Sequence, residues 1–419
     1  MAQLSDDCFA FDGPLMPLND ALARLSEKIH PCTGIETCAI EEAVGRFAAE
    51  TVTATRAVPP YANSAVDGYA VAHADLNADE ETVLPVIGRI AAGHPLGRDV
   101  EPRQAARIFT GAPLPQGVDT VMMQEDCSVE GETVKIRPGI KKGANTRSAG
   151  EDVAAGDTVL TAGQVLTPQS VGLAAAQGLR RISVHAPLRV AVFSTGDEVA
   201  EPGEEAASGQ LFDSNRYMIM ASLRSMNCTV IDHGILADNA ATITKTIAAV
   251  AADADVIVST GGMSTGEEDH VRAAIEAQGR VDFWRLAIKP GRPVGFGLIG
   301  AGDRTVPLVG LPGNPVAAFT TFKLLARPLL LRLAGATDLA EPRYRVVADF
   351  DYRKKKDRRE FVRSVITGRD AETGLPVIAK HGKGGAGMLS SLVGASGFAE
   401  LPEDLTHLDR GTVVDYLPF

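Results

Sequence analysis

The sequence predicts a multidomain protein of the α/β plus β class, with a doubly wound α/β domain, a β-rich insert and a C-terminal β-barrel. Strand-like and helix-like segments alternate over residues 187–338, which is typical of a parallel sheet with helices on both faces. Short β-branched segments between Gly and Pro occupy residues 56–150. From residue 339 to residue 419 the pattern becomes strands alone, which favours a small barrel or sandwich.

The N-terminal segment is predicted to begin with an amphipathic helix. Its apolar residues recur at helical spacing, at Leu18, Leu22, Leu25 and Ile29. Asn19 or Asp20 is expected to cap this helix, and Pro31 ends it. A helical pattern returns after the insert, so we assign residues 1–55 and 151–186 to one discontinuous, elongated domain.

The alternation within residues 187–338 can be assigned element by element. Strands are predicted at 190–193, 228–236, 256–259 and 306–309. Helices are predicted at 213–227, 240–252 and 271–277, with a long helix from Pro315. The C-terminal strands are expected at 344–350, 359–366, 375–380, 397–402 and 412–417.

Composition limits the class of protein. Hydrophobic residues at 45% and charged residues at 22% describe a globular chain. A formal net charge of -12 argues against nucleic acid as a partner. Five cysteines without C-x-x-C spacing argue against structural zinc and a disulfide framework. The chain has no signal-peptide pattern and no membrane-spanning segment, so we expect a cytoplasmic protein.

Polar, glycine-containing loops follow four apolar segments between residues 189 and 322. Ligands of open α/β sheets bind outside the carboxyl ends of the strands, so we expect these loops to converge on one crevice. The candidate residues in these loops are Thr195, Gly196, Glu198, Gly261, Gly262, Ser264, Asp269, Lys289, Arg292, Pro293, Pro312, Gly313, Asn314 and Pro315.

The residue types in these loops indicate a metal-assisted site for a phosphorylated or oxyanionic substrate. The loop at 310–315 is stiff and leads into a helix N-terminus, which favours an anion. Lys289 and Arg292 flank Pro290 and Gly291 and suit an oxyanion clamp. Asp238 and Asp269 follow strands and suit Mg²⁺, which prefers oxygen ligands. A plain strand–helix connection and two helix caps remain the structural alternatives.

Three motifs outside this region carry further candidates. Asp67 lies in "YANSAVDGYAV", which also fits an ordinary Asp-Gly turn. Thr110 begins a loop rich in proline, and Arg147 and Asp152 lie in "GANTRSAGEDV". Taken singly, each of these segments is also compatible with a surface loop.

Seven motifs in a fixed order resemble the molybdopterin molybdenumtransferase family, called MoeA in bacteria, and the E-domain of gephyrin. They are "NSAVDGYAV", "TGAPLPQGVDTVMMQED", "NTRSAGEDV", "FSTGDEV", "STGGMSTGEEDHV", "LAIKPGRP" and "GLPGNPV". The resemblance spans residues 14–419. It implies four domains, with molybdopterin bound by residues 187–338, and a homodimer whose active cleft is shared between subunits.

The resemblance also implies a reaction and assigns roles to residues. Adenylylated molybdopterin and molybdate would react with release of AMP, and molybdenum would enter at the dithiolene. Mg²⁺ would be the cofactor, with Asp238 and Asp269 as its carboxylates. The functional acids would be Asp67, Asp152, Glu198 and Asp269. The substrate surroundings would include Thr110, Arg147, Lys289, Arg292, Pro293, the 310–315 loop, Arg363 and Ser391. An adenylyltransferase and apo-molybdoenzymes or their chaperones would be further partners.

Two positions depart from the family pattern, and two other functions remain open. Arg292 stands where the family usually has Lys, and Ala317 where Ser is common, so the choice between molybdate and tungstate is undecided. The first alternative is the adenylyltransferase, whose single domain resembles residues 187–338; the additional domains argue against it. The second is a gephyrin-like scaffold without catalysis, against which the retained acidic residues argue.

Overall fold

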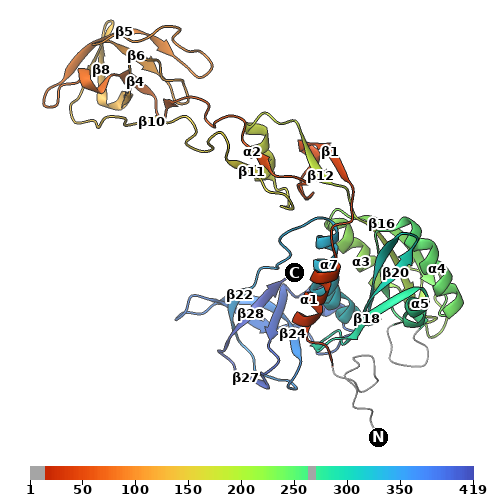
Figure 1. Ribbon diagram of the computed structural model, residues 1–419. Helices are drawn as coiled ribbons and strands as arrows, with labels where there is room; N and C mark the ends of the chain where they lie inside the picture. The colour runs from red at the N-terminus through yellow and green to blue at the C-terminus, as the bar shows by residue number, and fades with distance from the viewer. Residues whose placement is uncertain (1–14, 263–269) are drawn as a thin grey trace.

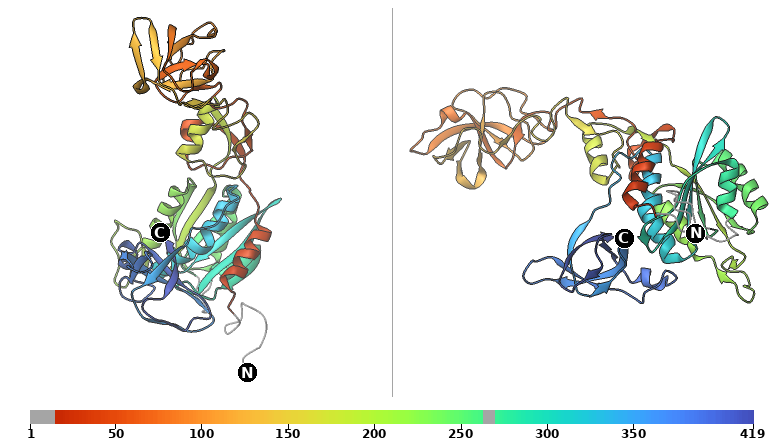
Figure 2. Two further views of the ribbon diagram at one scale, coloured as in Figure 1. Left: turned by 90° about the vertical axis from the view of Figure 1, so that its left-hand side faces the viewer. Right: turned by 60° about the horizontal axis from the view of Figure 1, so that its bottom comes forward.

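A long arm separates a distal β domain from a base that contains the α/β domain and the C-terminal β domain (Figure 1). The computed structural model describes residues 15–262 and 270–419. Two further views show the same arrangement, with the arm between the distal domain and the base (Figure 2).

The α/β domain is built on a six-stranded sheet in the order β16-β13-β17-β21-β20-β18. Its strands are β13 (Arg189–Thr195), β16 (Thr229–Leu236), β17 (Val256–Thr260), β18 (Gly279–Arg285), β20 (Pro293–Ala301) and β21 (Arg304–Leu311). Successive side chains of a strand point to opposite faces, so Val190 and Val192 enter one hydrophobic cluster, and Ala191 and Phe193 enter the other. The sheet is therefore buried on both faces.

Helices cover both faces of this sheet. One layer contains α3 (Ser214–Ser225), α6 (Pro315–Thr321) and α7 (Arg327–Leu333), and the other contains α4 (Ala240–Asp253) and α5 (His270–Gln278). A π-helical turn at Phe322–Ala326 joins α6 to α7 without a break. The side chains of Asp213 and Asn239 cap α3 and α4 by accepting backbone N–H bonds, which explains where these helices begin.

The four predicted strands form a parallel sheet as expected, and two further strands that were not predicted, β20 and β18, extend it with antiparallel pairing. Strands β16, β13, β17 and β21 run parallel, whereas β20 and β18 are antiparallel to their neighbours. The reason is local: Ala301 pairs with Arg304 across a tight turn, and Gly302 there has a φ of 63°. A two-residue hairpin reverses the chain and forces antiparallel pairing.

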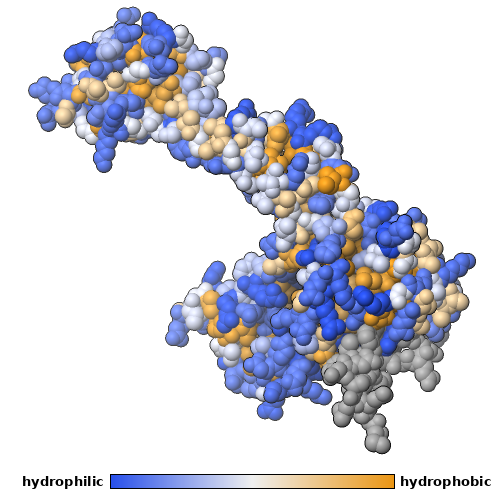
Figure 3. All heavy atoms as spheres, in the orientation of Figure 1, coloured by the Kyte–Doolittle hydropathy of each residue, from blue (hydrophilic) through white to orange (hydrophobic). Residues whose placement is uncertain are grey.

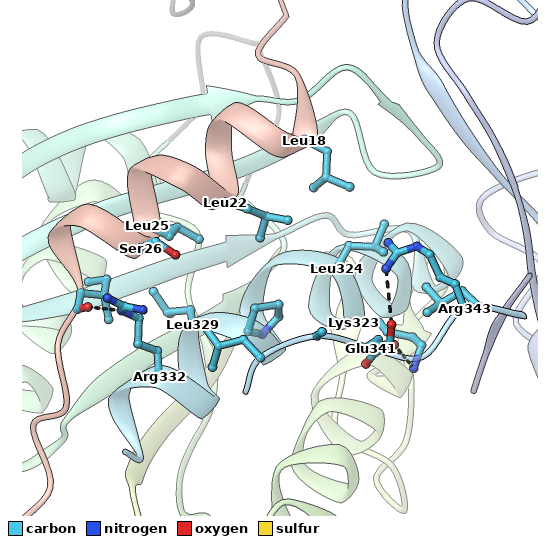
Figure 4. Close-up of a pocket in the computed structure, with 15 residues that line it drawn as sticks. Leu18, Leu22, Leu25, Ser26, Lys323, Leu324, Leu329, Arg332, Glu341 and Arg343 are labelled. Carbon is cyan, nitrogen blue, oxygen red and sulfur yellow. Dashed lines mark hydrogen bonds and ion pairs between the residues drawn. The ribbon is translucent and has the colours of Figure 1, made fainter. Parts of the chain in front are cut away.

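Helix α1 (Leu18–Lys28) packs on the α/β domain, so the expected grouping of residues 1–55 does not hold for its first part. Leu18, Ala21 and Leu25 are buried in the same cluster as α7. Figure 4 shows Leu18, Leu22 and Leu25 on the side of α1 that faces Leu324 and Leu329, around a cavity of about 250 Å³. The hydrophobic face of α1 decides its domain, because an amphipathic helix must bury that face against a partner.

The ends of α1 also differ partly from expectation. Its N-cap is Pro17, with no side-chain cap, so the predicted capping by Asn19 or Asp20 is wrong. The helix ends at Lys28, and the chain becomes extended at Ile29, as the position of Pro31 predicts.

The arm is a small unit with its own hydrophobic cluster. Strand β1 (Ile35–Ala39) pairs antiparallel with β12 (Arg181–His185), and β2 (Val52–Thr53) pairs with β11 (Thr158–Leu160). Helix α2 (Pro168–Ala176) covers them and begins with a capping box between Thr167 and Ser170. Segments from before and after the insert therefore meet in one core.

The distal domain is a six-stranded sheet in the order β7-β4-β6-β5-β9-β8. Its strands are β4 (Gly68–Val71), β5 (Thr82–Ile90), β6 (Ala105–Ile108), β7 (Thr120–Met123), β8 (Cys127–Glu130) and β9 (Thr133–Ile136). The pair β3 (Asn63–Ser64) and β10 (Thr146–Arg147) lies where this domain joins the arm. Strand β4 is buried along its whole length, because strands pair with both of its edges and its side chains enter hydrophobic clusters on both faces.

The C-terminal domain is a closed barrel of five strands. They are β22 (Tyr344–Ala348), β24 (Arg359–Arg369), β25 (Pro376–Lys380), β26 (Gly397–Leu401) and β28 (Val413–Pro418). The pairing of β24 with both β25 and β26 closes the ring. All five strands match the predicted segments. The short pair β23 (Tyr352–Arg353) and β27 (His407–Leu408) and helix α8 (Ser390–Val393) complete the domain.

The surface is mainly hydrophilic over the C-terminal domain, whereas hydrophobic and hydrophilic residues are interspersed over the arm and the distal domain (Figure 3). None of the helices in the described part of the chain is long and apolar enough to span a membrane.

We predict that Leu25→Ala lowers the thermal unfolding midpoint of the α/β domain, because Leu25 is 3% exposed and packs in its core. The expected destabilisation is about 2–5 kcal/mol. Glu27→Ala, on the exposed side of the same helix, is the matched control and should change the midpoint little. Equal midpoints for the two variants would show that α1 is not part of this core.

Candidate active site

The carboxyl ends of the central strands and the first turn of α3 surround a cavity of about 630 Å³. The loops after β13, β17 and β21 reach it together, as the topology of a parallel sheet predicts. The predicted residues that line it are Thr195, Glu198, Gly261, Gly262, Pro293, Pro312, Gly313, Asn314 and Pro315. We call this the first cavity.

Backbone contact between two of these loops requires glycine. Gly261 has a φ of 85°, and a Cβ atom there would lie 2.2 Å from the carbonyl oxygen of Thr195. The loops after β13 and β17 therefore touch backbone to backbone, which brings Thr195 and Gly262 to one wall of the first cavity.

The loop after β21 leads directly into α6. Asn314 is the N-cap residue and Pro315 occupies the first turn, where a missing N–H costs nothing. The side chain of Asn314 makes no capping bond. Instead, the N–H of Val316 donates to the carbonyl of Ala386 at 2.9 Å, so a loop of the C-terminal domain lies against the start of this helix.

A second cavity of about 340 Å³ adjoins the first and shares Pro293, Pro312 and Asn314 with it. It lies between the α/β domain and the C-terminal barrel. The side chains that give it charge are Lys289, Arg292, Arg358, Arg363, Lys380 and Glu360. Cations outnumber carboxylates here, so the second cavity favours an anion.

The predicted Lys289–Arg292 clamp is held against both domains. Strand β19 (Ile288–Lys289) pairs with β24 of the barrel. Gly291 has a φ of 107°, and a Cβ atom there would lie 2.4 Å from Cγ2 of Thr321 in α6. Arg292 is exposed, and its side chain has neither a hydrogen bond nor an ion pair within the described residues. Its guanidinium can therefore turn toward a ligand.

Arg363 is a buried cation at the second cavity, only 8% exposed. Its two terminal nitrogens donate to the carbonyl oxygens of Gly385 at 3.1 Å and Lys383 at 3.0 Å. Its Nε has no partner in the described part of the chain. Burial lowers the pKa of this guanidinium, yet arginine stays charged in proteins. A buried charge with an unused donor is costly unless an acceptor reaches it.

Glu360 is the buried carboxylate of the second cavity, 1% exposed. It accepts from Arg358 at 2.7 Å, from the Tyr352 hydroxyl at 2.9 Å and from Lys289 Nζ at 3.2 Å. Burial acts to raise its pKa, but these donors outweigh burial and hold the pKa below its usual value. Glu360 therefore stays ionised and orients Lys289 and Arg358.

Several predicted residues lie away from both cavities. Asp238 follows β16, where its N–H donates to Asp197 Oδ1 at 3.4 Å, and it lines neither cavity. Ser391 is 4% exposed, and its hydroxyl donates to the Met388 carbonyl. Ser264 and Asp269 lie outside the described residues.

Four predicted site residues that precede the α/β domain in the chain lie at the far end of the arm. Asp67 and Thr110 belong to the distal domain, and Arg147 and Asp152 lie where it joins the arm. Within one chain the structure does not bring these four residues to the cavities (Figures 1 and 2). Asp67 Oδ1 accepts from the Thr110 N–H and hydroxyl, each at 2.8 Å, and these bonds lower the pKa of its carboxyl.

Some cavity residues were missed by sequence reasoning. In the first cavity these are Ser194, Asp213, Ser214, Asn215 and Thr260, and in the second they include Tyr352, Arg358 and Lys380. The predicted start of a helix near Ser214, at the ligand-binding edge of a parallel sheet, was the available signal for the first group. No local signal marks the second group, because its residues come from a separate domain.

Three family models cover most of the chain. The MoeA N-terminal region (domain I and II) matches residues 16–178, a probable molybdopterin binding domain matches 191–332, and the MoeA C-terminal region (domain IV) matches 345–419. Molybdopterin molybdenumtransferase of Haemophilus influenzae is 36% identical over 97% of this chain and 99% of its own length. Molybdopterin molybdenumtransferase 2 of Mycobacterium tuberculosis is 34% identical over 93% and 96%.

Solved structures agree with these matches. The molybdopterin biosynthesis MoeA protein of Pyrococcus horikoshii OT3 superimposes with a TM-score of 0.83, at 28% identity, over 97% of this chain and all of its own. Similarity thus extends through the arm, the α/β domain and the barrel in one order. The chain belongs to the MoeA family of molybdopterin molybdenumtransferases.

Proposed function

We propose that this protein inserts molybdate into adenylylated molybdopterin and releases AMP, as a step of molybdenum cofactor biosynthesis. The observation that carries the proposal is the pair of adjoining cavities, one inside the α/β domain and the other lined by several cations. The first cavity has a molybdopterin-binding fold around it, and the second contains the unpaired donor of Arg363. A substrate with a heterocycle at one end fits the first cavity, and the oxyanion with which it reacts fits the second.

The second cavity is the proposed molybdate subsite. All four oxygens of molybdate accept hydrogen bonds, so its site must supply donors and positive charge. Arg363 Nε, Lys289, Arg292 and Lys380 supply them around one space. Because Arg363 is fixed by two carbonyl oxygens and Lys289 by Glu360, these donors are oriented before the anion arrives.

Mg²⁺ is the proposed cofactor, and the oxygen donors near β13 and β16 fit it. The carboxylates of Asp197 and Asp238 lie at the ligand-binding edge of the sheet, and carboxylate oxygen is the ligand type that Mg²⁺ prefers. We propose Asp238, together with Asp269, as the residues that would hold the ion. Bound there, Mg²⁺ would neutralise charge on the phosphoanhydride. Glu198 is proposed as the functional acid at the first cavity.

A homodimer with a shared cleft is proposed to complete the site. Asp67, Thr110, Arg147 and Asp152 lie at the far end of the arm from the cavities of their own chain. A second copy could bring them to a cavity without bending the arm. The free thiols of Cys32, Cys38, Cys127 and Cys228 suit the proposed cytoplasmic location. An adenylyltransferase and apo-molybdoenzymes or their chaperones are the proposed further partners.

Arg363→Ala should raise the molybdate concentration for half-saturation by roughly 10- to 100-fold, the range for loss of a charged hydrogen-bond donor. The assay titrates molybdate at saturating adenylylated molybdopterin and follows AMP release. Arg369→Ala, on the exposed end of the same strand, is the matched control. Since Arg363 is buried, the thermal midpoint is measured for both variants. A folded Arg363→Ala enzyme with unchanged half-saturation would remove this residue from the subsite.

We expect Arg292→Ala to weaken the use of molybdate much more than Ala317→Ser changes it. Both residues line the second cavity, but Arg292 supplies a charge and two parallel donors, whereas a serine hydroxyl adds about 1 kcal/mol at most. Arg292→Lys should restore most of the lost affinity because it keeps the charge. The same titration decides the matter: equal effects of Arg292→Ala and Ala317→Ser contradict the assignment.

Mixed dimers provide a test of the shared cleft. Inactive Asp67→Ala subunits mixed with inactive Glu198→Ala subunits should recover about a quarter of wild-type activity, because half of the dimers then contain one intact cleft. Subunit exchange is followed independently with two differently tagged chains. Confirmed exchange without recovered activity would show that both residues act within one subunit or not at all.

A further inference from the structure

The first turn of α3 is fixed at the wall of the first cavity. Asp213 caps the helix by accepting the N–H of Arg216 at 3.0 Å. The Arg216 side chain is 2% exposed and binds Asp213, Asp232 and Glu201, with 2.5 Å to each oxygen of Asp232. Asn215 lies between these two anchored residues, so its backbone position is set before a ligand binds.

The hydrogen bonds of Asn215 determine which way its side-chain amide faces. Its Nδ2 donates to the Gly313 carbonyl at 2.7 Å and to Thr260 Oγ1 at 3.1 Å. The single hydroxyl hydrogen of Thr260 is directed to the Pro312 carbonyl at 3.4 Å, so Thr260 must accept from Asn215. The reverse orientation would place Asn215 Oδ1 against the Gly313 carbonyl, which is also an acceptor. Both donors of Asn215 are therefore in use.

The side-chain oxygen of Asn215, Oδ1, is an acceptor without a partner in the described part of the chain. Asn215 is 9% exposed and lines the first cavity, and its Oδ1 has no hydrogen bond within the described residues. A buried acceptor left in this state is unfavourable until a donor reaches it. The cavity also has the carboxylates of Glu198 and Asp213 in its wall. The Asp213 carboxylate is already paired with Arg216, so the amide oxygen of Asn215 and the Glu198 carboxylate are the acceptors of this wall that can attract an N–H donor.

We propose that Asn215 is a specificity-determining residue whose Oδ1 accepts a hydrogen bond from an N–H donor on the pterin ring. The inference rests on the proposed function, because it takes molybdopterin as the ligand of the first cavity. A pterin carries an amino group beside a ring N–H, so one edge of it is made of donors. Asn215 thus selects the pterin ring in the first cavity, and the cationic second cavity binds the oxyanion.

Binding of the two ligands to the full-length protein tests the assignment. Asn215→Ala should weaken binding of molybdopterin roughly tenfold, the value for one hydrogen bond to a buried acceptor, and leave molybdate binding within about twofold. Thr260→Val is the matched variant: it removes the anchor of the amide but keeps Asn215 Oδ1. Because Thr260 also lines the first cavity, Thr260→Val should weaken binding of molybdopterin, but by less than Asn215→Ala does and by no more than about threefold, since the acceptor is kept.

Three outcomes overturn the proposal. They are wild-type affinity for molybdopterin in Asn215→Ala, an equal loss in Thr260→Val, and an equal loss for molybdate. The second outcome would mean that Asn215 only anchors the loop at Gly313, and the third that the whole site is disturbed.

A measurement on the wild type covers the case in which Asn215→Ala fails to fold. With ¹³C at the asparagine side-chain carbonyls, molybdopterin should lower the stretching frequency of one carbonyl in the infrared difference spectrum, and molybdate should lower none. The absence of a shift with bound molybdopterin contradicts the proposal. A wild type that binds molybdopterin but transfers no molybdenum contradicts the proposed function alone.

Discussion

The contact between the C-terminal barrel and the α/β domain is the constraint on which the candidate site depends. It consists of the pairing of β19 with β24 and the bond from Val316 to Ala386. The first places Lys289 beside the barrel, and the second brings the loop after β25 to the start of α6. Without this contact the second cavity would lack the wall that the barrel supplies, and Arg363 would face solvent.

Polarity divides the candidate site into two parts. The first cavity is lined by oxygen acceptors at the sheet edge and the start of α3, whereas the second has several cations around one buried carboxylate. Glu360 and Arg363 differ in how their hydrogen bonds are used. Glu360 accepts from three side chains and orients them, whereas the Nε donor of Arg363 has no partner within the described residues. Such a division can position a ligand that has a neutral ring at one end and an oxyanion at the other.

Much of the fold and part of the candidate site followed from local sequence patterns. The strand–loop–helix units around Thr195, Gly261 and Gly313 were predictable, because parallel strands end at one edge and their loops must meet there. The hairpin at Gly302 was missed, although Gly302 and Asp303 lie between two apolar segments and are residues typical of a tight turn. Asn215 was missed because an asparagine in a first helical turn is ordinary until its partners are known.

The sequence by itself determined the order of the elements, the buried faces of the strands and the seven motifs that identify the family. Each depends on residues close together in the chain. Only the tertiary structure decided that α1 belongs with α7, that Arg363 lies beside the Lys289 loop, and that Asp67 lies at the far end of the arm. These facts depend on contacts between residues separated by tens to hundreds of positions, and no local periodicity encodes such contacts.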